Sequence, residues 1–411
     1  MYGGDEVGSL VFDIGSFNSR FGYSGEDTPR YVFESHIGVS QIQSNDDVIM
    51  DNKEVKYFFG ENELRYYKPG IIVNNPINSQ GYVENFNLLE KLVENVYNKC
   101  FRTESKDHPI LLSEPVLHNK DNRLNIAQLL FEKFDIPALF ITKSPVLSAF
   151  SSGRSTCLVL DSGHNYTSAT PINDGYALQK SLIRYNIGGE YISNELRNVL
   201  KSKEIDIVPH YKFIKEFNTE RGCYITKYLS PEETVSDISY ENFWTNEIIR
   251  EVKESSLTVS DEGKDSFIKP IQYELPDGKI FELREEKVSI VEKLFNQKKS
   301  IPGFNGIHLM VVDAINKGDI DIKKEMFSNI FLCGGNTLFP NFADKLQRHI
   351  INSAPQNVRV KVICHPTPSE KRFSTWIGGS ILSSLGNFHQ MWFSKQEYEE
   401  HGAILIERKC A

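Results

Sequence analysis

The sequence predicts an α/β protein whose chain forms two similar domains, each built around a β-sheet, with a cleft between them. Two apolar runs, residues 9–12 and 157–160, each end in an aspartate and a glycine-containing turn. Each unit is interpreted as a buried strand that carries Asp13 or Asp161 into a tight turn before the chain returns as a second strand. A single unit could be an ordinary hairpin, whereas two copies favour a duplicated domain. A chain of 411 residues is long enough for about two domains with large cores.

The rest of the chain alternates between strand and helix patterns, which is typical of a mixed or parallel sheet covered by helices. Apolar residues at helical spacing predict a helix over 84–99, and the apolar run at 108–113 predicts a strand. Residues 35–75 lack a regular pattern and are expected to be irregular. Further helices are expected around 126–130, 192–200, 342–350 and 376–388.

The composition is that of a globular protein, with 40% hydrophobic and 25% charged residues and a formal net charge of −9. Non-specific DNA binding depends on clustered Lys and Arg, so this chain is not expected to bind DNA directly by itself. The six cysteines are scattered without a C-x-x-C pair, which favours free thiols over a zinc site. No apolar run is long enough to span a membrane, and no membrane association is expected.

The two aspartate turns have the chemistry of a phosphate site. Glycine lets backbone N–H groups approach an anion closely, and the amides around Gly15, Ser16 and Gly163 could supply such donors. Asp13 and Asp161 could hold Mg²⁺ through its bound waters. The chain contains no G-x-x-x-x-G-K-[ST] segment, which excludes a P-loop.

Several segments resemble the actin family. Residues 13–16 and 161–163 resemble its two phosphate loops, and residues 333–340 resemble its adenosine-binding turn. Residues 376–382 and 391–398 are similar to its C-terminal signature, which distinguishes actins from sugar kinases and chaperones of the same core fold. The resemblance covers almost the whole chain. It implies an actin-like, duplicated ribonuclease-H-like fold, with two large domains of two subdomains each around a nucleotide cleft.

The resemblance also implies domain boundaries. The first domain is expected over 1–152 and 372–411, with residues 35–75 as its small subdomain. The second domain is expected over 153–371, with an enlarged and divergent fourth subdomain over 189–305.

By resemblance, the cleft is expected to hold ATP with Mg²⁺ bound through water to Asp13 and Asp161. Arg20 stands where actins carry a phosphate-contacting lysine. The same turns could instead persist only because they hold the fold, with no nucleotide bound. The nucleotide contacts that the resemblance implies are Asp13, Gly15, Ser16, Arg20, Asp161, Ser162, Gly163, Gly189, Glu220, Gly334, Gly335, Asn336, Phe339 and Arg372.

Several positions depart from the family pattern. Hydrolysis needs a group that orients the attacking water and accepts its proton. Ser144 replaces a glutamine, His164 an aspartate and Ser168 a histidine of the actins, so no catalytic residue and little or no hydrolysis are expected. His164 is expected to be a solvent-facing turn residue, with a relocated base as the alternative. Phe17 replaces a glycine, and Thr219 replaces a nucleoside-contacting lysine.

The opening residues 2–7 are similar to those of nuclear actin-related subunits of chromatin complexes. This resemblance implies a nuclear, non-catalytic scaffold of SWI/SNF-type remodelling or histone-acetyltransferase complexes. Its implied partners are actin, the helicase-SANT-associated helix of a remodeller ATPase, and other subunits. The alternative is a slow actin-type ATPase or a filament-forming cytoskeletal actin-related protein. Because residues 35–75 resemble actin poorly, self-polymerisation is not expected.

The partner helix is expected to lie in a groove between the two large subdomains. Apolar, methionine-containing grooves accept amphipathic helices. The predicted lining residues are Phe150, Leu382, Leu385 and Met391, although Leu382 and Leu385 could equally belong to the core.

Overall fold

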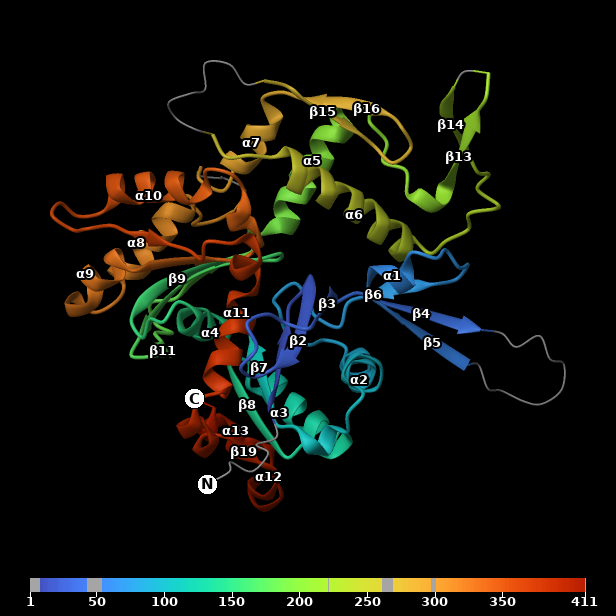
Figure 1. Cartoon of the computed structure of the whole chain (residues 1–411). Helices are drawn as coiled ribbons and strands as arrows, with labels where there is room; N and C mark the ends of the chain where they lie inside the picture. Colours follow the sequence, from blue (N-terminus) through green and yellow to red (C-terminus); the bar gives the residue numbers. More distant parts are fainter. Residues whose placement is uncertain (1–7, 43–53, 221, 261–268, 297–300, 411) are drawn as a thin grey trace, which may run out of the picture.

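The two strand–turn–strand units lie at the centres of two six-stranded sheets (Figure 1). The structure, a computed structural model, describes residues 8–42, 54–220, 222–260, 269–296 and 301–410. Within these residues the first sheet runs, in spatial order, through β19 (Phe393–Ser394), β8 (Ala138–Lys143), β7 (Ile110–Glu114), β1 (Leu10–Ile14), β2 (Asn18–Tyr23) and β3 (Tyr31–Glu34). The second runs through β11 (Tyr176–Ala177), β10 (Thr167–Asn173), β9 (Cys157–Ser162), β17 (Ile330–Cys333) and β18 (Val362–Ile363), with β12 (Ile183–Tyr185) paired to β10.

Both sheets repeat one pairing pattern. β1 is antiparallel to β2 and parallel to β7, and β9 is antiparallel to β10 and parallel to β17. The apolar runs of β1 and β9 are buried, as central strands covered on both faces must be. This repetition confirms the predicted α/β fold with an internal duplication.

Each sheet has its own apolar core and its own helices. The first core gathers buried residues from chain segments before residue 150 and after residue 375, and the second gathers residues between 158 and 350. Helices of the first core are α2 (Phe86–Asn95), α3 (Lys120–Gln128), α4 (Ser144–Ser151), α11 (Pro368–Ser383) and α13 (Ile406–Lys409), with α12 (Lys395–His401) beside them. Helices of the second core are α5 (Gly189–Ser202), α6 (Ile238–Ser256), α7 (Glu286–Glu292), α8 (Ile307–Asn316), α9 (Ile320–Ser328) and α10 (Phe342–Ser353). Short 3-10 or π-helical segments cover Val96–Phe101, Ser105–Asp107, Leu129–Lys133, His210–Lys212, Gly335–Leu338, Gly386–Gln390 and Ala403–Leu405.

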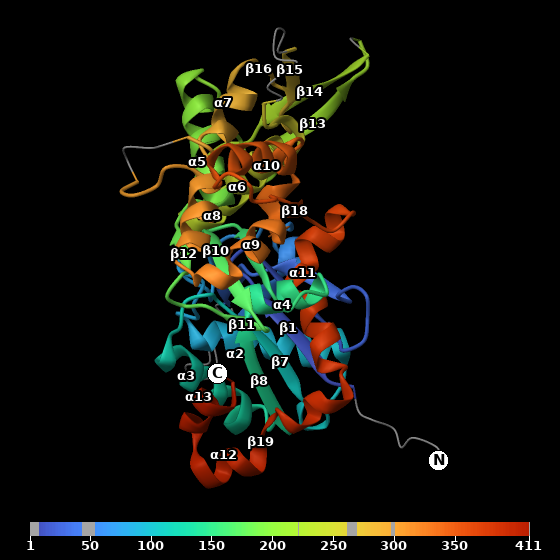
Figure 2. The same ribbon diagram turned by 90° about the vertical axis from the view of Figure 1, so that its left-hand side faces the viewer.

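The helices α4 and α11 cross between the two sheets (Figure 2). Their backbones approach so closely that a Cβ atom placed on Gly378 would lie 1.7 Å from the carbonyl oxygen of Leu147. Beside this crossing, the buried Trp376 donates its indole N–H to the carbonyl oxygen of Val11 at 3.0 Å. The crossing therefore requires glycine and ties α11 to the central strand of the first sheet.

The expectation of an irregular segment over 35–75 is wrong. This segment forms a three-stranded sheet of β4 (Ile37–Ile42), β5 (Glu54–Phe59) and β6 (Ile72–Asn74). Helix α1 (Gly60–Leu64) directly follows β5 in the chain. The alternation of apolar and polar residues in β5 is the signal for this sheet. The acidic residues 45–47 lie outside the described residues.

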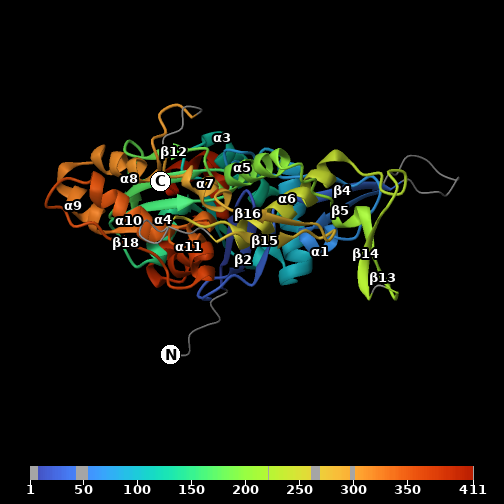
Figure 3. The ribbon, with the colours of Figure 1, turned by 90° about the horizontal axis from the view of Figure 1, so that it is seen from above.

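The divergent part of the second domain contains two hairpins and the long helix α6. The hairpins are formed by β13 (Phe213–Asn218) with β14 (Cys223–Tyr228), and by β15 (Ile271–Glu274) with β16 (Ile280–Leu283). Figure 3 shows the β13–β14 hairpin standing away from the body of the molecule. A third apolar cluster joins α6 to the small sheet of the first domain. The two domains therefore also contact each other through α6. Among the described helices, none combines the length and apolarity needed to cross a membrane.

Candidate nucleotide-binding cleft

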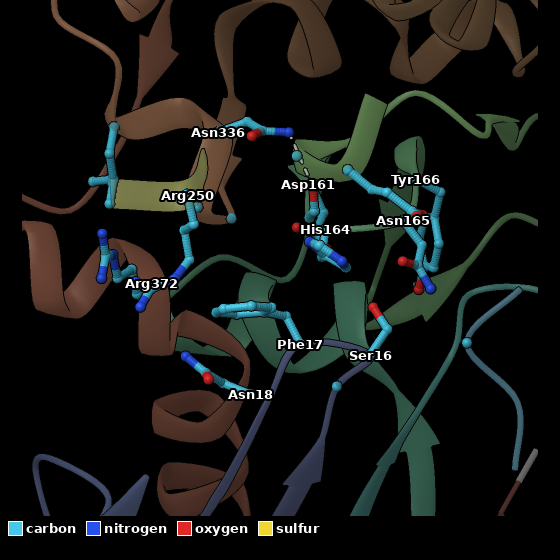
Figure 4. A pocket seen from close by; sticks show the side chains of 18 of the residues that line it. Ser16, Phe17, Asn18, Asp161, His164, Asn165, Tyr166, Arg250, Asn336 and Arg372 are labelled. Atoms are coloured by element: carbon cyan, nitrogen blue, oxygen red, sulfur yellow. Dashed lines mark hydrogen bonds between the residues drawn. The ribbon is translucent and has the colours of Figure 1, made fainter. Parts of the chain in front are cut away.

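A cavity of about 410 Å³ lies between the two domains, where the two aspartate turns face each other (Figure 4). This volume falls within the range of small-molecule sites, about 300–1,000 Å³. Its walls come from the β1–β2 turn, the β9–β10 turn, the start of α5, α6, the turn after β17 and the start of α11.

Most of the residues predicted to contact a nucleotide line this cavity. Ser162 lies behind it: its buried hydroxyl contacts Thr167 Oγ1 at 2.8 Å and accepts from Asn336 Nδ2 at 3.2 Å, so it holds the turn in place. The predicted residues that line the cavity are Asp13, Gly15, Ser16, Arg20, Asp161, Gly163, Gly189, Gly334, Gly335, Asn336, Phe339 and Arg372.

The prediction for Glu220 is wrong. Glu220 is exposed beyond the end of β13, where its backbone N–H donates to Asn218 Oδ1 at 3.0 Å, and it does not line the cavity. A lysine–glutamate pair does line the cavity, but it is Lys253 with Glu254 on α6. The lysine of the cleft is therefore Lys253, and Thr219 does not replace it.

Sequence reasoning missed α6, although its signals are present. Asp237 caps the helix by accepting from the backbone N–H of Ser239 at 2.8 Å. Buried residues then recur at helical spacing, with polar residues on the opposite face. The buried apolar positions are Tyr240, Phe243, Trp244, Ile248, Ile249 and Val252.

Lys253 is a buried cation in the cleft wall. Its side chain is only 7% exposed, and its Nζ donates to the carbonyl oxygen of Gly189 and to Ser193 Oγ, both at 3.1 Å. Burial lowers the pKa of Lys253 to about 8, so the ammonium is still charged at neutral pH. Arg372 adds a second positive group, held by Glu254 Oε2 at 3.0 Å.

The two aspartates lie in different electrostatic environments. Asp13 is held at both oxygens, by Arg20 Nη1 at 2.7 Å and by Ser113 Oγ at 2.6 Å. Burial, together with the negative charge of Asp13, raises the pKa of Asp161 to about 6. A cation near Asp161 would offset this cost, because opposite charge favours the ionised carboxylate.

The second phosphate turn is braced by backbone contacts. The carbonyl oxygen of Gly163 accepts from the N–H of Gly189 at 2.9 Å and from Asn336 Nδ2 at 3.0 Å. Gly334 has a φ of +92°, and a Cβ atom there would lie 2.6 Å from Asp161 Oδ1. Only glycine fits this position, because it tolerates both the positive φ and the close approach.

These residues fit a nucleotide with a hard cation. Mg²⁺ prefers carboxylate and water oxygens, and Asp13 and Asp161 supply such oxygens on opposite walls of one cavity. Arg20, Lys253 and Arg372 supply positive charge for phosphate groups. The predicted residues of both phosphate turns, except Ser162, and those of the turn after β17 therefore face the cleft.

His164 is not the solvent-facing residue expected from the sequence. It lines the cavity, and its ring lies against Phe17 with centroids 5.0 Å apart (Figure 4). The guanidinium of Arg250 lies 5.4 Å from the centroid of Phe17. Burial, with the nearby positive charge of Lys253, lowers the pKa of His164 to about 3. The imidazole is therefore neutral at physiological pH and makes a bridge between the two phosphate turns.

The other two positions that differ from the actin pattern, Ser144 and Ser168, lie in different surroundings. Ser144, at the start of α4, lines the cavity with a short hydroxyl. Ser168 lies on β10 opposite Asp161, is fully buried, and does not line the cavity.

The predicted groove residues differ in exposure. Leu382 is only 8% exposed and belongs to the core of the first domain, so its assignment to the groove is wrong. Leu385 and Met391 are 42% and 46% exposed, and Phe150 is half-buried. Ile381, the residue before Leu382, is exposed instead, because neighbouring residues on a helix point about 100° apart.

Comparison with known proteins agrees with the fold. The family profile described as Actin matches residues 4–411. The chain is 37% identical to Actin-related protein 4 of Arabidopsis thaliana over 444 aligned positions, and 37% identical to Actin-related protein 4 of Oryza sativa subsp. indica over 451, with all of each chain covered. The protein therefore belongs to the actin family, as an actin-related protein.

Proposed function

We propose that this protein is a non-catalytic, actin-related scaffold subunit of nuclear chromatin-remodelling or histone-acetyltransferase complexes. The full-length similarity to proteins named Actin-related protein 4 supports this role. The observation that carries it is the cleft itself, which keeps charged groups for a nucleotide while Ser144 and a neutral His164 replace residues that serve hydrolysis.

In this proposal the nucleotide holds the two domains together. When bound, ATP with Mg²⁺ supplies negative phosphate oxygens and a cation between the two walls. Arg20 and Lys253 would bind phosphate charge from opposite domains, and Asp13 and Asp161 would hold the cation through its waters.

The same geometry disfavours hydrolysis. A general base works best when its pKa lies near the operating pH, and the pKa of about 3 makes His164 a weak proton acceptor. The hydroxyl of Ser144 is a poor base and too short to replace a glutamine that positions water. His164 as a relocated base is thus the weaker interpretation.

We expect Lys253→Met to weaken ATP binding by about tenfold or more, since hydrogen bonds to charged groups contribute about 1.5–3 kcal/mol. Methionine keeps most of the buried volume but removes the ammonium. Calorimetric titration of nucleotide-free protein with Mg-ATP measures the change. Lys201→Met, at an exposed position of α5, removes the same charge and should leave the affinity unchanged. Equal affinities in both variants would contradict a role for Lys253.

A single-turnover assay tests the proposed lack of catalysis. The bound nucleotide is first extracted from purified protein and counted, and radiolabelled ATP is then followed over hours. Intact ATP supports a scaffold that uses nucleotide as a structural ligand. Steady phosphate release would instead support an actin-type ATPase, and pelleting of filaments with Mg-ATP would support a filament-forming protein. The observation that favours these alternatives is that Asp13 and Asp161 are retained.

The proposed partner surface is the exposed apolar set Ile381, Leu385 and Met391 at the end of α11 and beyond it. An amphipathic helix binds by burying such side chains. We expect Leu385→Asp to weaken capture of a remodeller-ATPase helix by about tenfold or more, because a buried unpaired carboxylate opposes docking. Ile320→Asp, at an exposed apolar position of α9, is the matched control. If both variants bind the helix as well as the unchanged protein, this surface is not the docking site.

A further inference from the structure

The small sheet of the first domain is fastened to the second domain by the third apolar cluster, here called the clasp. The first turns of α6 lie beside α1 and β6 (Figure 1). Large interfaces of buried apolar side chains restrict the motion of one domain relative to another. The clasp combines side chains of both domains, each more than nine-tenths buried: Leu64, Ile71, Val73, Tyr211, Tyr240, Phe243 and Trp244.

Two hydrogen bonds fix the orientation of the clasp. The hydroxyl of Tyr240 donates to the carbonyl oxygen of Leu64 at 2.8 Å. The backbone N–H of Val73 donates to Ser239 Oγ, also at 2.8 Å. Strand β6 lies at an edge of the small sheet, and edge strands have N–H groups that another segment can pair. Because apolar burial is not directional, these bonds determine which groups of the two domains meet.

Tyr67 extends the clasp on its more exposed side. Its ring stacks on that of Tyr211, with centroids 5.1 Å apart and an interplanar angle of 2°. Its hydroxyl donates to the carbonyl oxygen of Val235 at 2.6 Å. Tyr67 belongs to the first domain, and both of these partners belong to the second. Because Tyr67 is only half-buried, it can be replaced with little effect on the core of either domain.

The clasp adjoins the nucleotide cavity. Phe243 belongs to the clasp and also lines the cavity. Its ring packs against that of His36, another lining residue, with centroids 5.4 Å apart. The first domain contacts the second again beyond β6, where the carbonyl oxygen of Gln80 accepts from Arg184 Nη2 of β12 at 2.9 Å. Gly81, the next residue, lines the cavity. Interdomain contacts therefore border the cavity both at α6 and near β12.

We propose that the clasp holds the cleft closed without a ligand, and that a nucleotide enters and leaves only when the clasp opens. The rate of exchange is then set by rare opening of the clasp. The proposal rests on the proposed function only in requiring that the cavity binds a nucleotide. A contact that stabilises the closed state of both free and loaded protein changes the rates of entry and release more than it changes Kd.

Stopped-flow fluorescence with N-methylanthraniloyl-ATP and Mg²⁺, on the full-length protein, measures entry and release. Tyr67→Ala should speed both by about tenfold or more, because it removes a stacked ring and a hydrogen bond from the clasp. Kd should change much less than either rate. Tyr240→Phe keeps the buried ring, removes only the bond to Leu64, and should give a smaller acceleration. Tyr66→Ala, at the neighbouring position, which is 75% exposed, should leave the rates unchanged.

Amide hydrogen exchange of the nucleotide-free protein, followed by mass spectrometry, tests closure without a ligand. The peptide that contains Val73 should exchange slowly in the unchanged protein and in Tyr66→Ala, and faster in Tyr67→Ala and Ser239→Ala. Fast exchange of this peptide in the unchanged protein would overturn the proposal.

The kinetic results separate this proposal from the proposed function. Nucleotide binding with equal rates in Tyr67→Ala and Tyr66→Ala would contradict the clasp alone. If neither the unchanged protein nor any variant binds the analogue, nucleotide binding itself is contradicted, and the clasp has no exchange to control. Binding that becomes measurable only in Tyr67→Ala or Tyr240→Phe would support both.

Discussion

Gly378→Ala is expected to destabilise the protein by about 3 kcal/mol or more. The added Cβ would lie 1.7 Å from the carbonyl oxygen of Leu147, which is backbone and cannot rotate away. The helices α4 and α11 would have to separate along their crossing. Alanine favours the helix over glycine by about 1 kcal/mol, so helix propensity alone predicts that Gly378→Ala would stabilise the protein. Denaturant midpoints and Tm measured by circular dichroism report the change.

Gly386→Ala provides the control for this prediction. A Cβ atom at Gly386 would meet no other atom within 4 Å, and its substitution should leave the denaturant midpoint nearly unchanged. If Gly378→Ala is as stable as the unchanged protein, the two helices do not approach as closely as described.

Arg123→Met is expected to cost about 3–5 kcal/mol, the usual effect of removing one partner from a buried ion pair. Arg123 is buried and donates to both oxygens of Glu114, from Nε at 2.8 Å and from Nη2 at 2.7 Å. Lys143 Nζ lies 3.2 Å from Glu114 Oε1 and offsets part of the loss. Equilibrium denaturation in urea measures the difference.

A double variant separates the ion pair from simple packing. Arg123→Met combined with Glu114→Leu should recover part of the lost stability, because no unpaired buried carboxylate remains. Lys106→Met, in the exposed pair with Glu104, should leave the urea midpoint unchanged. Equal losses in the single and double variants would show that shape rather than charge explains the effect.

The sequence was sufficient to predict the parts of the fold that depend on local patterns. The apolar runs before Asp13 and Asp161 formed central strands, and the glycine turns after them formed opposite walls of one cleft. The helical periodicities over 84–99 and 342–350 also gave helices, α2 and α10. These features depend on apolar patterns and turn residues within short stretches of sequence, which can be read without knowing the tertiary contacts.

What the sequence did not reveal depends on tertiary contacts. Matching Glu220 by chain order placed it in the cleft, whereas α6 brings Lys253 and Glu254 there from a later segment. The choice between Ile381 and Leu382 as the exposed residue depends on how α11 is rotated against its sheet, which apolar identity alone cannot show.

The contact between Phe17 and His164 would limit the effect of a bound nucleotide on the opening of the cleft. The two rings join the phosphate turns of opposite domains through the protein's own side chains, and Arg250 covers Phe17 from α6. A ligand shifts a conformational equilibrium only by the difference between its affinities for the two states. Because these side chains themselves connect the two turns, nucleotide turnover would change the population of open molecules less than in a cleft closed by phosphate alone. A bound nucleotide would then add to contacts that the protein makes itself, and its hydrolysis would not determine when the cleft opens.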